Sequence, residues 1–367
     1  MPSTVAGGPA APAPGSSARP LRIVALSGGV GGARFLRGLL RHLAVTDTAH
    51  DVTVVANTAD DITLHGLRVC PDLDTVMYTL AGGVHEQQGW GRPDETFTVT
   101  DELRAHGADV AWFTLGDRDL ATHLLRTQLL REGHTLSQVT ERLCQRWRTG
   151  VRLLPMSDEP VETHVDVEAP DVTRLHFQEW WVRHHAALPA TGFVVEGAAD
   201  ARPAPGVLDA LAAADVVLLP PSNPVVSIGA ILAVPGLREA LRDVPVPVVG
   251  VSPIIAGAPV RGMADACLRA IGVPSTAEAV ARLYSDLLDG WLVAAEDAPA
   301  PGAYSGPWSR PRPRATGLAV RSRPLVMHDA DAAASIAGAA LDLALELGGI
   351  PAADASATET RDSGGPR

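Results

Sequence analysis

The sequence predicts an α/β fold: a Rossmann-like, doubly wound and mainly parallel sheet with an inserted smaller α+β region. Two features predict this class. Short apolar runs that end in glycine or polar residues alternate with amphipathic stretches of helical length, as strands and helices do around a parallel sheet. Residues 161–167 depart from this rhythm, because their strict apolar–polar alternation is typical of a half-exposed antiparallel strand.

Six apolar runs have the length and composition of buried strands. In chain order they cover residues 21–26, 51–56, 110–115, 216–219, 246–251 and 324–327. Ligands of an open parallel sheet bind beyond the carboxyl ends of its strands. Segments rich in glycine, aspartate, serine or asparagine directly follow these runs, so we expect side chains that are distant in sequence to meet at one edge of the sheet.

Helices are expected between the runs, and several have recognisable ends. Thr135 and Gln138 have the spacing of a capping box, and Ser275 with Glu278 repeats that spacing before a later helix. Gly150 is a typical C-terminal stop. The expected helices cover residues 75–81, 118–131, 135–149, 276–289 and 330–347.

The 367 residues suit two or three domains, or one large α/β domain with insertions. The first stretch is rich in Ala, Pro, Gly and Ser and lacks the regions of a signal peptide. An Arg- and Pro-rich stretch at 301–323 is left without a role. We predict a disordered leader at 1–20, a Rossmann-like nucleotide-binding core at 21–120 and 211–347, an inserted substrate-covering region at 121–210 and a flexible tail at 351–367.

Composition excludes several classes of function. The chain has 42 acidic and 30 basic residues, and every basic residue is arginine, so no P-loop or Schiff-base lysine exists. The net charge of −12 argues against nucleic-acid binding, which needs a basic surface. No apolar run reaches the length of about 20 residues that a membrane helix needs. The three cysteines are widely spaced, as in a cytoplasmic protein with reduced thiols.

Residues 27–34, Ser-Gly-Gly-Val-Gly-Gly-Ala-Arg, follow the first expected strand and open a helix, whose N–H groups can bind phosphate. Arg34 stands where a dinucleotide fingerprint needs its third glycine, and Asn57 replaces the acidic residue that holds an NAD ribose. Phosphate binding is therefore favoured over an NAD-dependent oxidoreductase, with a plain strand–helix turn as the alternative. The candidate phosphate ligands are Gly28, Gly29, Gly31, Gly32 and Arg34.

Four carboxylates lie close together in the next part of the chain: Asp60, Asp61, Asp72 and Asp74. Mg²⁺ prefers oxygen ligands and is commonly held by one or two carboxylates together with substrate phosphates. We expect Asp60 and Asp72 to hold it, while one of the four could instead accept a proton from an alcohol. For Asp72 and Asp74, capping of the helix at 75–81 is the alternative.

Charged residues also follow the third expected strand. Asp117 has the position of a helix cap, and Arg118 and Asp119 could also reach the pocket. His123, one turn later, is more typical of a packed or surface histidine. Arg34, Arg118 and Arg261 are candidates to neutralise phosphate charge.

A serine- and asparagine-rich turn follows the fourth expected strand. Ser222, Asn223 and Ser227 offer hydrogen bonds to a phosphate or a base, or form an Asx-type turn with a serine cap. Trp180 and Trp181 concentrate aromatic surface in an aromatic-poor chain, so they could line a pocket for a flat ring or form the core of the inserted region.

As a set, these segments resemble the 2-phospho-L-lactate transferase family of coenzyme F420 biosynthesis, from about residue 21 to about residue 347. Each motif alone is common, whereas the ordered combination is specific. The motifs are SGGVGGARFL at 27–36, NTADD at 57–61, CPDLDT at 70–75, LGDRDLA at 115–121, PMSD at 155–158 with VET at 161–163, and PSNP at 221–224.

The resemblance implies a Mg²⁺-dependent, homodimeric enzyme. The family moves a phospho-organic-acid unit from a guanosine diphosphate-linked donor to the terminal hydroxyl of the deazaflavin Fo, and releases GMP. It implies that the glycine turn, Asp117, Arg118 and residues 222–227 hold the nucleotide, and that the inserted region covers the deazaflavin. The implied roles of the remaining residues are Fo binding by Asn57, Thr58 and Asp60, metal binding by Asp60 and Asp72, and base or alternate roles for Asp61 and Asp74.

The acid carried by the donor is a further expectation. The lysine-free composition rich in Ala, Arg and Pro resembles proteins of high-GC actinobacteria, whose family members use a phosphoenolpyruvyl donor and make dehydro-F420-0. A phospholactyl donor is the alternative.

A rival function is a non-catalytic nucleotide-sugar-binding regulator of the related gluconeogenesis-factor family. Its glycine loop usually reads Gly-Gly-Gly-Thr-Gly, where this chain has Gly-Gly-Val-Gly-Gly.

Overall fold

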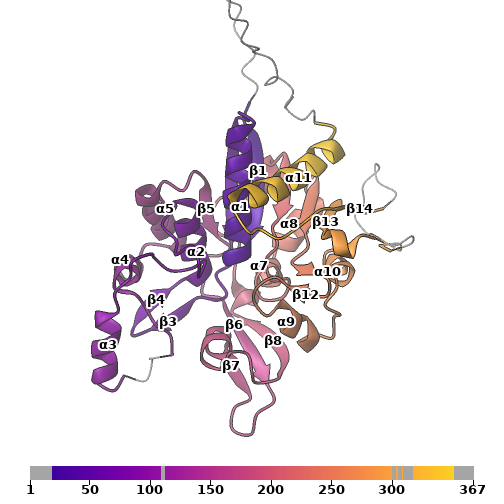
Figure 1. Cartoon of the computed structure of the whole chain (residues 1–367). Helices are drawn as coiled ribbons and strands as arrows, with labels where there is room; N and C mark the ends of the chain where they lie inside the picture. Colours follow the sequence, from indigo (N-terminus) through magenta and orange to yellow (C-terminus); the bar gives the residue numbers. More distant parts are fainter. Residues whose placement is uncertain (1–18, 109–111, 300–302, 305–307, 309–316, 351–367) are drawn as a thin grey trace, which may run out of the picture.

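A seven-stranded parallel sheet forms the centre of the protein (Figure 1). The computed structural model describes residues 19–108, 112–299, 303–304, 308 and 317–350. The strand order is β14-β13-β10-β9-β1-β2-β5, and each neighbouring pair is parallel. The strands are β1 (Leu21–Ser27), β2 (His50–Ala56), β5 (Arg152–Pro155), β9 (Val216–Leu219), β10 (Val248–Val251), β13 (Gly290–Val293) and β14 (Ala319–Ser322).

Both faces of this sheet are buried, which explains why its strands are continuously apolar. Successive side chains of a strand point to opposite faces. Accordingly, Ile23 and Ala25 of β1 pack into one hydrophobic cluster, and Val24 and Leu26 pack into a second. The predicted doubly wound fold is confirmed by this arrangement, and four of the six expected strands correspond to β1, β2, β9 and β10.

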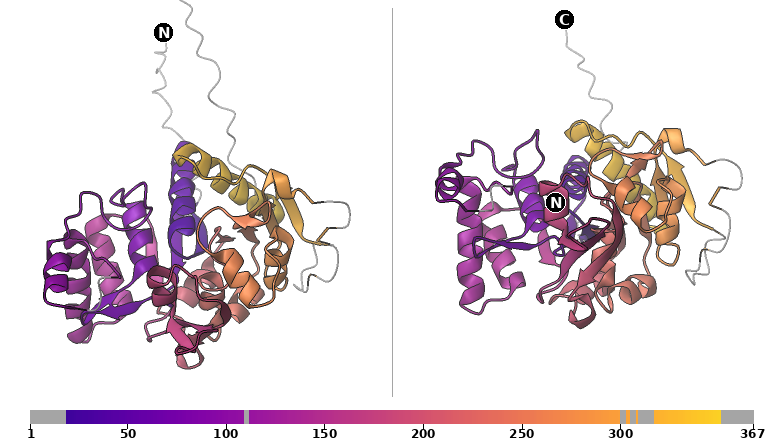
Figure 2. Two further views of the ribbon diagram at one scale, coloured as in Figure 1. Left: turned by 60° about the horizontal axis from the view of Figure 1, so that its bottom comes forward. Right: turned by 90° about the horizontal axis from the view of Figure 1, so that it is seen from below.

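Helices cover both faces of the central sheet. The first cluster contains buried residues of α1 (Val30–Val45), α2 (Pro71–Leu80), α5 (Leu136–Trp147) and α11 (Ala330–Gly348). Figures 1 and 2 show α1 and α11 side by side, although they come from opposite ends of the chain. The second cluster contains residues of α6 (Val207–Ala213), α7 (Ile228–Ala233), α8 (Leu237–Asp243), α9 (Ala264–Ala270) and α10 (Ala277–Leu283).

Smaller elements flank the central sheet. The alternating segment forms β6 (Glu162–Val167), which pairs antiparallel with β7 (Arg174–His176) and β8 (Ala190–Glu196), as predicted. This sheet lies below the central one in Figure 1. The other elements are the hairpins β3 (Ile62–Leu64) with β4 (Leu67–Val69) and β11 (Ile254–Ile255) with β12 (Ala258–Pro259), the helices α3 (Thr98–Ala105) and α4 (Asp117–Arg131), and the short turns η1 (Glu179–Arg183), η2 (Ala198–Asp200) and η3 (Ala295–Asp297).

Two expected strands are wrong. Residues 112–115 form no strand, because their apolar side chains pack against β3 and β4 in a small separate cluster; residues 110 and 111 lie outside the described part. Residues 324–327 also form no strand, and β14 lies a few residues earlier, at the end of the Arg- and Pro-rich stretch. Pro324 has no N–H to give to a ladder, which disfavours a strand at that place.

The ends of some helices differ from those expected by a few residues. Thr135 and Gln138 form the predicted capping box of α5. The later cap is Thr276 and not Ser275, and α10 ends at Leu283, before the expected end. Helix α2 starts with Pro71 at its first turn, earlier than expected, so neither nearby aspartate is an N-cap.

The predicted division of the chain at residues 121 and 210 stays a prediction. Within that range, β5 joins the central sheet, whereas β6, β7 and β8 form the separate antiparallel sheet. No helix in the described residues is long and apolar enough to cross a membrane.

Candidate active site

A cavity of about 1420 Å³ opens where the order of the sheet reverses. The chain runs from β1 outward to β2 and later returns to the other side of β1 with β9, so the loops after β1 and β9 separate here. Such a switch point is the usual ligand site of a doubly wound sheet. The predicted site residues that line the cavity are Gly29, Gly31, Arg34, Asp60, Asp72, Asp74, Ser222, Asn223 and Ser227.

The other predicted site residues do not line the cavity. The Gly28 N–H donates to Ser222 Oγ at 3.0 Å, which joins the two turns. Asp117 accepts from the N–H groups of Thr98 and Val99, so it ties α3 to α4. The predicted residues that do not line the cavity are Gly28, Gly32, Asn57, Thr58, Asp61, Asp117 and Arg118.

The glycine-rich turn is packed so tightly that side chains do not fit. A side-chain carbon at Gly31 would collide with the Pro221 carbonyl, and one at Gly32 would collide with Ser27 Oγ. Helix α1 starts after Gly29 with no side-chain cap, so its first N–H groups have no intrahelical partner. The turn therefore presents unpaired backbone donors and a positive helix end at the cavity.

Asp60 and Asp72 are the buried carboxylates of the cavity. Asn57 Nδ2 donates to Asp72 Oδ2 at 2.9 Å, and Asn57 Oδ1 accepts from the Ala59 N–H, so Asn57 holds both carboxylate-bearing segments together. Burial raises the pKa of Asp72 to about 6. Burial, and then the nearby charge of Asp72, raise the pKa of Asp60 well above its usual range.

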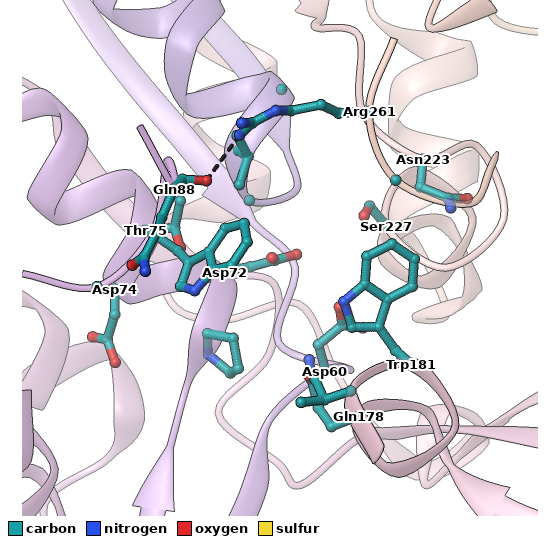
Figure 3. Close-up of a pocket in the computed structure, with 18 of the residues that line it drawn as sticks. Asp60, Asp72, Asp74, Thr75, Gln88, Gln178, Trp181, Asn223, Ser227 and Arg261 are labelled. Atoms are coloured by element: carbon teal, nitrogen blue, oxygen red, sulfur yellow. Dashed lines mark hydrogen bonds between the residues drawn. The ribbon is translucent and has the colours of Figure 1, made fainter. Parts of the chain in front are cut away.

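The chemistry of this pair fits a cation. Oδ1 of Asp60 is buried without any hydrogen-bond partner, although buried polar atoms are normally paired. Burial raises the pKa of both carboxylates, and the charge of Asp72 raises that of Asp60 further, so a divalent ion between them would remove this penalty. Figure 3 shows Asp72 pointing toward the open space beside Ser227 and Asp60, whereas Asp74 lies apart and points away.

Asp74 belongs instead to a buried ion-pair network. Both of its oxygens accept from Arg126, which is 1% exposed. His123 lies between Asp74 and Asp119, with Nδ1 at 3.7 Å from Asp74 Oδ2 and Nε2 at 3.3 Å from Asp119 Oδ2. The Tyr78 hydroxyl donates to Asp119 Oδ1 at 2.7 Å.

This network also has the composition of a metal site. Ligand atoms of Asp74, Asp119 and His123 lie within 4.8 Å of one another. The guanidinium of Arg126 already neutralises Asp74, so this set fits a metal less well than Asp60 with Asp72. Sequence reasoning missed Arg126 and Tyr78. The spacing of residues 119, 123 and 126 on one helical face was the available signal.

Asp61 lies outside the cavity and is fully buried. Neither of its oxygens has a hydrogen-bond partner, and the nearest cation is Arg68, whose Nη2 lies 3.6 Å from Oδ2. Burial raises the pKa of Asp61 to about 7, and the charge of Arg68 opposes this increase.

The adjacent tryptophans have different places. Trp180 is 1% exposed in the core beneath β6 to β8, and its ring N–H donates to the Leu188 carbonyl at 2.8 Å. Trp181 lines the cavity beside Gln178, on the side that carries Asp60 (Figure 3). The turn η1, which connects β7 to β8, thus presents one aromatic ring to the cavity and buries the other.

A parallel doubly wound sheet with a glycine-rich turn, buried carboxylates and a large cavity at its switch point defines a Rossmann-like α/β ligand-binding protein. Comparisons identify the family. The model of the family described as 2-phospho-L-lactate transferase CofD matches residues 23–309. The chain therefore belongs to the 2-phospho-L-lactate transferase CofD family, which is a family of transferases.

Relatives agree with this membership. A phosphoenolpyruvate transferase of Kitasatospora aureofaciens is 60% identical over 329 residues, which cover 89% of this chain and 99% of that protein. Another from Thermobifida fusca is 60% identical over 333 residues, with the same coverage. One from Mycolicibacterium smegmatis is 51% identical over 337 residues, covering 88% and 99%.

Solved structures agree with the fold. A UPF0052 family protein from Bacillus halodurans has a TM-score of 0.57 and covers 89% of this chain and 100% of its own. Its sequence is 16% identical, so the likeness concerns the fold alone.

Proposed function

We propose that this protein transfers a phosphoenolpyruvyl group from a guanosine diphosphate-linked donor to the terminal hydroxyl of Fo, giving dehydro-F420-0 and GMP. The observation that carries the proposal is the position of Asp60 and Asp72 beside the glycine-rich turn. The turn can bind an anion and the two carboxylates can bind a cation, so a metal-bound diphosphate would fit between them. The names of the relatives favour phosphoenolpyruvate as the acid, and 2-phospho-L-lactate is the alternative.

The donor diphosphate would bind at the start of α1. Free N–H groups after Gly29 face the cavity, and the serine hydroxyls of the turn after β9 stand opposite them. Ser222 Oγ accepts from Gly28 and keeps its own hydrogen for a ligand, and Ser227 lines the same wall. These donors complement phosphate oxygens without a lysine.

Asp60 and Asp72 would hold Mg²⁺ against the diphosphate. A bound Mg²⁺ supplies charge neutralisation for the phosphoryl oxygens. The fit rests on the unpaired Oδ1 of Asp60, on the burial of both carboxylates and on the charge of Asp72, which raises the pKa of Asp60.

The chain's own groups would manage the proton of the acceptor. The Fo hydroxyl oxygen forms a bond to the phosphorus that carries the acid, the bond from that phosphorus to the GMP oxygen breaks, and the hydroxyl proton leaves. Asp60 is the best-placed acceptor, because Asp61 lies outside the cavity and Asp74 is paired with Arg126. Positioning and charge neutralisation supply most of the catalysis in such transfers.

The acceptor would lie on the side of the antiparallel sheet. Trp181 offers a flat apolar surface and Gln178 a hydrogen-bonding amide, and both line the cavity near Asp60. A deazaflavin ring has matching chemistry, because it is flat and carries polar edges. The homodimer and the cytoplasmic location stay predictions.

Replacing Asp60 tests this assignment. Asp60→Asn removes the charge and keeps the shape, so we expect kcat to fall by at least about 100-fold while the circular dichroism spectrum is unchanged. Asp209→Asn, an exposed residue of α6, serves as the control and should retain full turnover. Near-normal turnover by Asp60→Asn would show that neither the metal nor the proton depends on this carboxylate.

A further inference from the structure

Two arginines from different parts of the chain converge at one end of the cavity. Arg34 belongs to α1, and Arg261 follows β12 on the opposite side. A side-chain carbon at Gly89 would lie 3.1 Å from Arg261 Nη1 and 3.5 Å from Arg34 Nη2, so both guanidinium groups approach the same point. The same carbon would lie 2.8 Å from a methyl group of Val30, which places the pair beside the first turn of α1.

Neutral backbone atoms hold these arginines. Arg261 Nη1 donates to the Gln88 carbonyl at 2.8 Å, as Figure 3 shows, and Nη2 donates to the Gln87 carbonyl at 2.9 Å. Arg34 Nη2 donates to the Glu86 carbonyl at 3.3 Å. All three carbonyls belong to the segment 85–91, which folds back on itself through a bond from the His85 N–H to the Gly91 carbonyl at 3.0 Å.

The two guanidinium groups lack a direct carboxylate partner among the described residues, although the charge of Glu86 acts on Arg34 from beyond ion-pair distance. No carboxylate of the described part of the chain forms an ion pair with Arg34 or Arg261, whereas the neighbouring Arg37 pairs with Glu86 at 2.6 Å. Burial, and then the charge of Arg261, lower the pKa of Arg34. Two unpaired guanidinium groups this close together repel each other, and an anion between them removes that penalty.

The position of the pair indicates which anion it meets. In Figure 3, Trp181, Gln178 and Asp60 lie on one side of Asp72, and Arg261 lies on the other. If the acceptor occupies the Trp181 side, an in-line displacement places the leaving group on the Arg261 side. The leaving group is the nucleotide phosphate, which gains a negative charge when its bond to the transferred phosphorus breaks.

We propose that Arg34 and Arg261 form an arginine clamp that binds the departing nucleotide phosphate and stabilises the charge developing on it. This inference rests on the proposed transfer reaction, and it gives two of the arginines expected to neutralise phosphate charge a specific role on the leaving group. Before the donor binds, the carbonyls of segment 85–91 satisfy the guanidinium donors. The nucleotide phosphate then accepts hydrogen bonds from the guanidinium groups in place of the carbonyls. When the transfer is complete, this phosphate is the monoester of GMP, which carries one more negative charge than it did in the substrate.

The experiment compares three single variants of the whole protein: Arg34→Gln, Arg261→Gln and Arg37→Gln. Arg37 is the matched control, because it lies on the same helix, contacts the same segment through Glu86 and does not line the cavity. For each variant, kcat and KM for the donor are measured, together with the affinity for GMP by calorimetry.

A clamp on the leaving phosphate predicts that kcat falls by about 100-fold in Arg34→Gln and in Arg261→Gln. GMP affinity should fall by roughly tenfold in both, and Arg37→Gln should retain both quantities. An unchanged GMP affinity with a raised KM for the donor would overturn the proposal, because the two arginines would then bind the acid group of the donor and not its nucleotide phosphate. Equal losses in Arg37→Gln would overturn it as well, since segment 85–91 alone would then explain the effect.

The proposed function can fail separately. If the wild-type protein transfers nothing to Fo, the reaction is refuted, while the GMP affinities still decide whether the two arginines bind a nucleotide phosphate. If GMP binds equally to all four proteins, the clamp is refuted even when transfer occurs.

Discussion

The four clustered aspartates look alike in the sequence but have four different surroundings. Asp72 is hydrogen-bonded to Asn57, Asp60 has a buried oxygen without a partner, Asp74 is held by Arg126, and Asp61 lies behind the cavity wall. Spacing alone predicted that carboxylates gather near a phosphate site. It could not separate them, because Arg126 and Arg68 come from positions that only the fold brings close.

Asp61 makes stability depend on pH. Its pKa is about 7 in the folded protein and about 4 in an unfolded chain. The folded state therefore binds the proton more tightly. This contribution to stability is complete below about pH 4 and is lost as the pH rises through about 7.

Asp61→Asn cannot ionise and should avoid this loss. We expect the variant to be more stable than the wild type at pH 8 by roughly 1–3 kcal/mol, and the gain to shrink toward pH 4. Urea unfolding at both pH values measures it. A variant less stable than wild type at pH 8 would mean that the ion pair with Arg68 outweighs the cost of burying the charge.

At the scale of elements, the turns after β1 and β9 form one unit. Gly28 donates to Ser222, and Gly31 approaches the Pro221 carbonyl so closely that only a hydrogen fits. The glycines thus set the distance between the two turns as well as the access to α1. The sequence indicated a phosphate loop, but it did not indicate this contact between turns almost 200 residues apart.

Gly31→Ala should therefore push the two turns apart. We expect a loss of about 1–3 kcal/mol in unfolding free energy, as is typical of overpacking, together with weaker GDP binding. Gly192→Ala is the control, because its added carbon would meet nothing closer than Asp166 Oδ2 at 3.8 Å. If both variants unfold and bind GDP alike, the close approach at Gly31 carries no cost.

The strands were predictable where both faces of the sheet are buried. Continuous apolar runs identified β1, β2, β9 and β10, because only a doubly covered sheet needs such strands. The same signal failed at 112–115, where apolar residues cover the hairpin of β3 and β4. Apolar composition reports burial, but it does not say against which element a run packs.

At the scale of the whole molecule, topology brings the candidate site together. The sheet reverses at β1, so the turns after β1 and β9 face each other, and the cavity extends toward the antiparallel sheet with Trp181. The ordered motifs had already indicated the family, which the comparisons confirm. The contacts of Arg261 and the environment of Trp181 required the structure, because they depend on how distant loops meet.

The proposed transfer reaction is tested most directly by a turnover assay of the whole protein with Fo, Mg²⁺ and freshly generated guanosine diphosphate-linked phosphoenolpyruvate or 2-phospho-L-lactate. We expect that GMP is released and that the mass of Fo increases by one phosphoenolpyruvyl unit. A phospholactyl product would correct only the acid. No product from either donor, in folded protein that binds GDP, would contradict the transferase and favour a nucleotide-binding regulator.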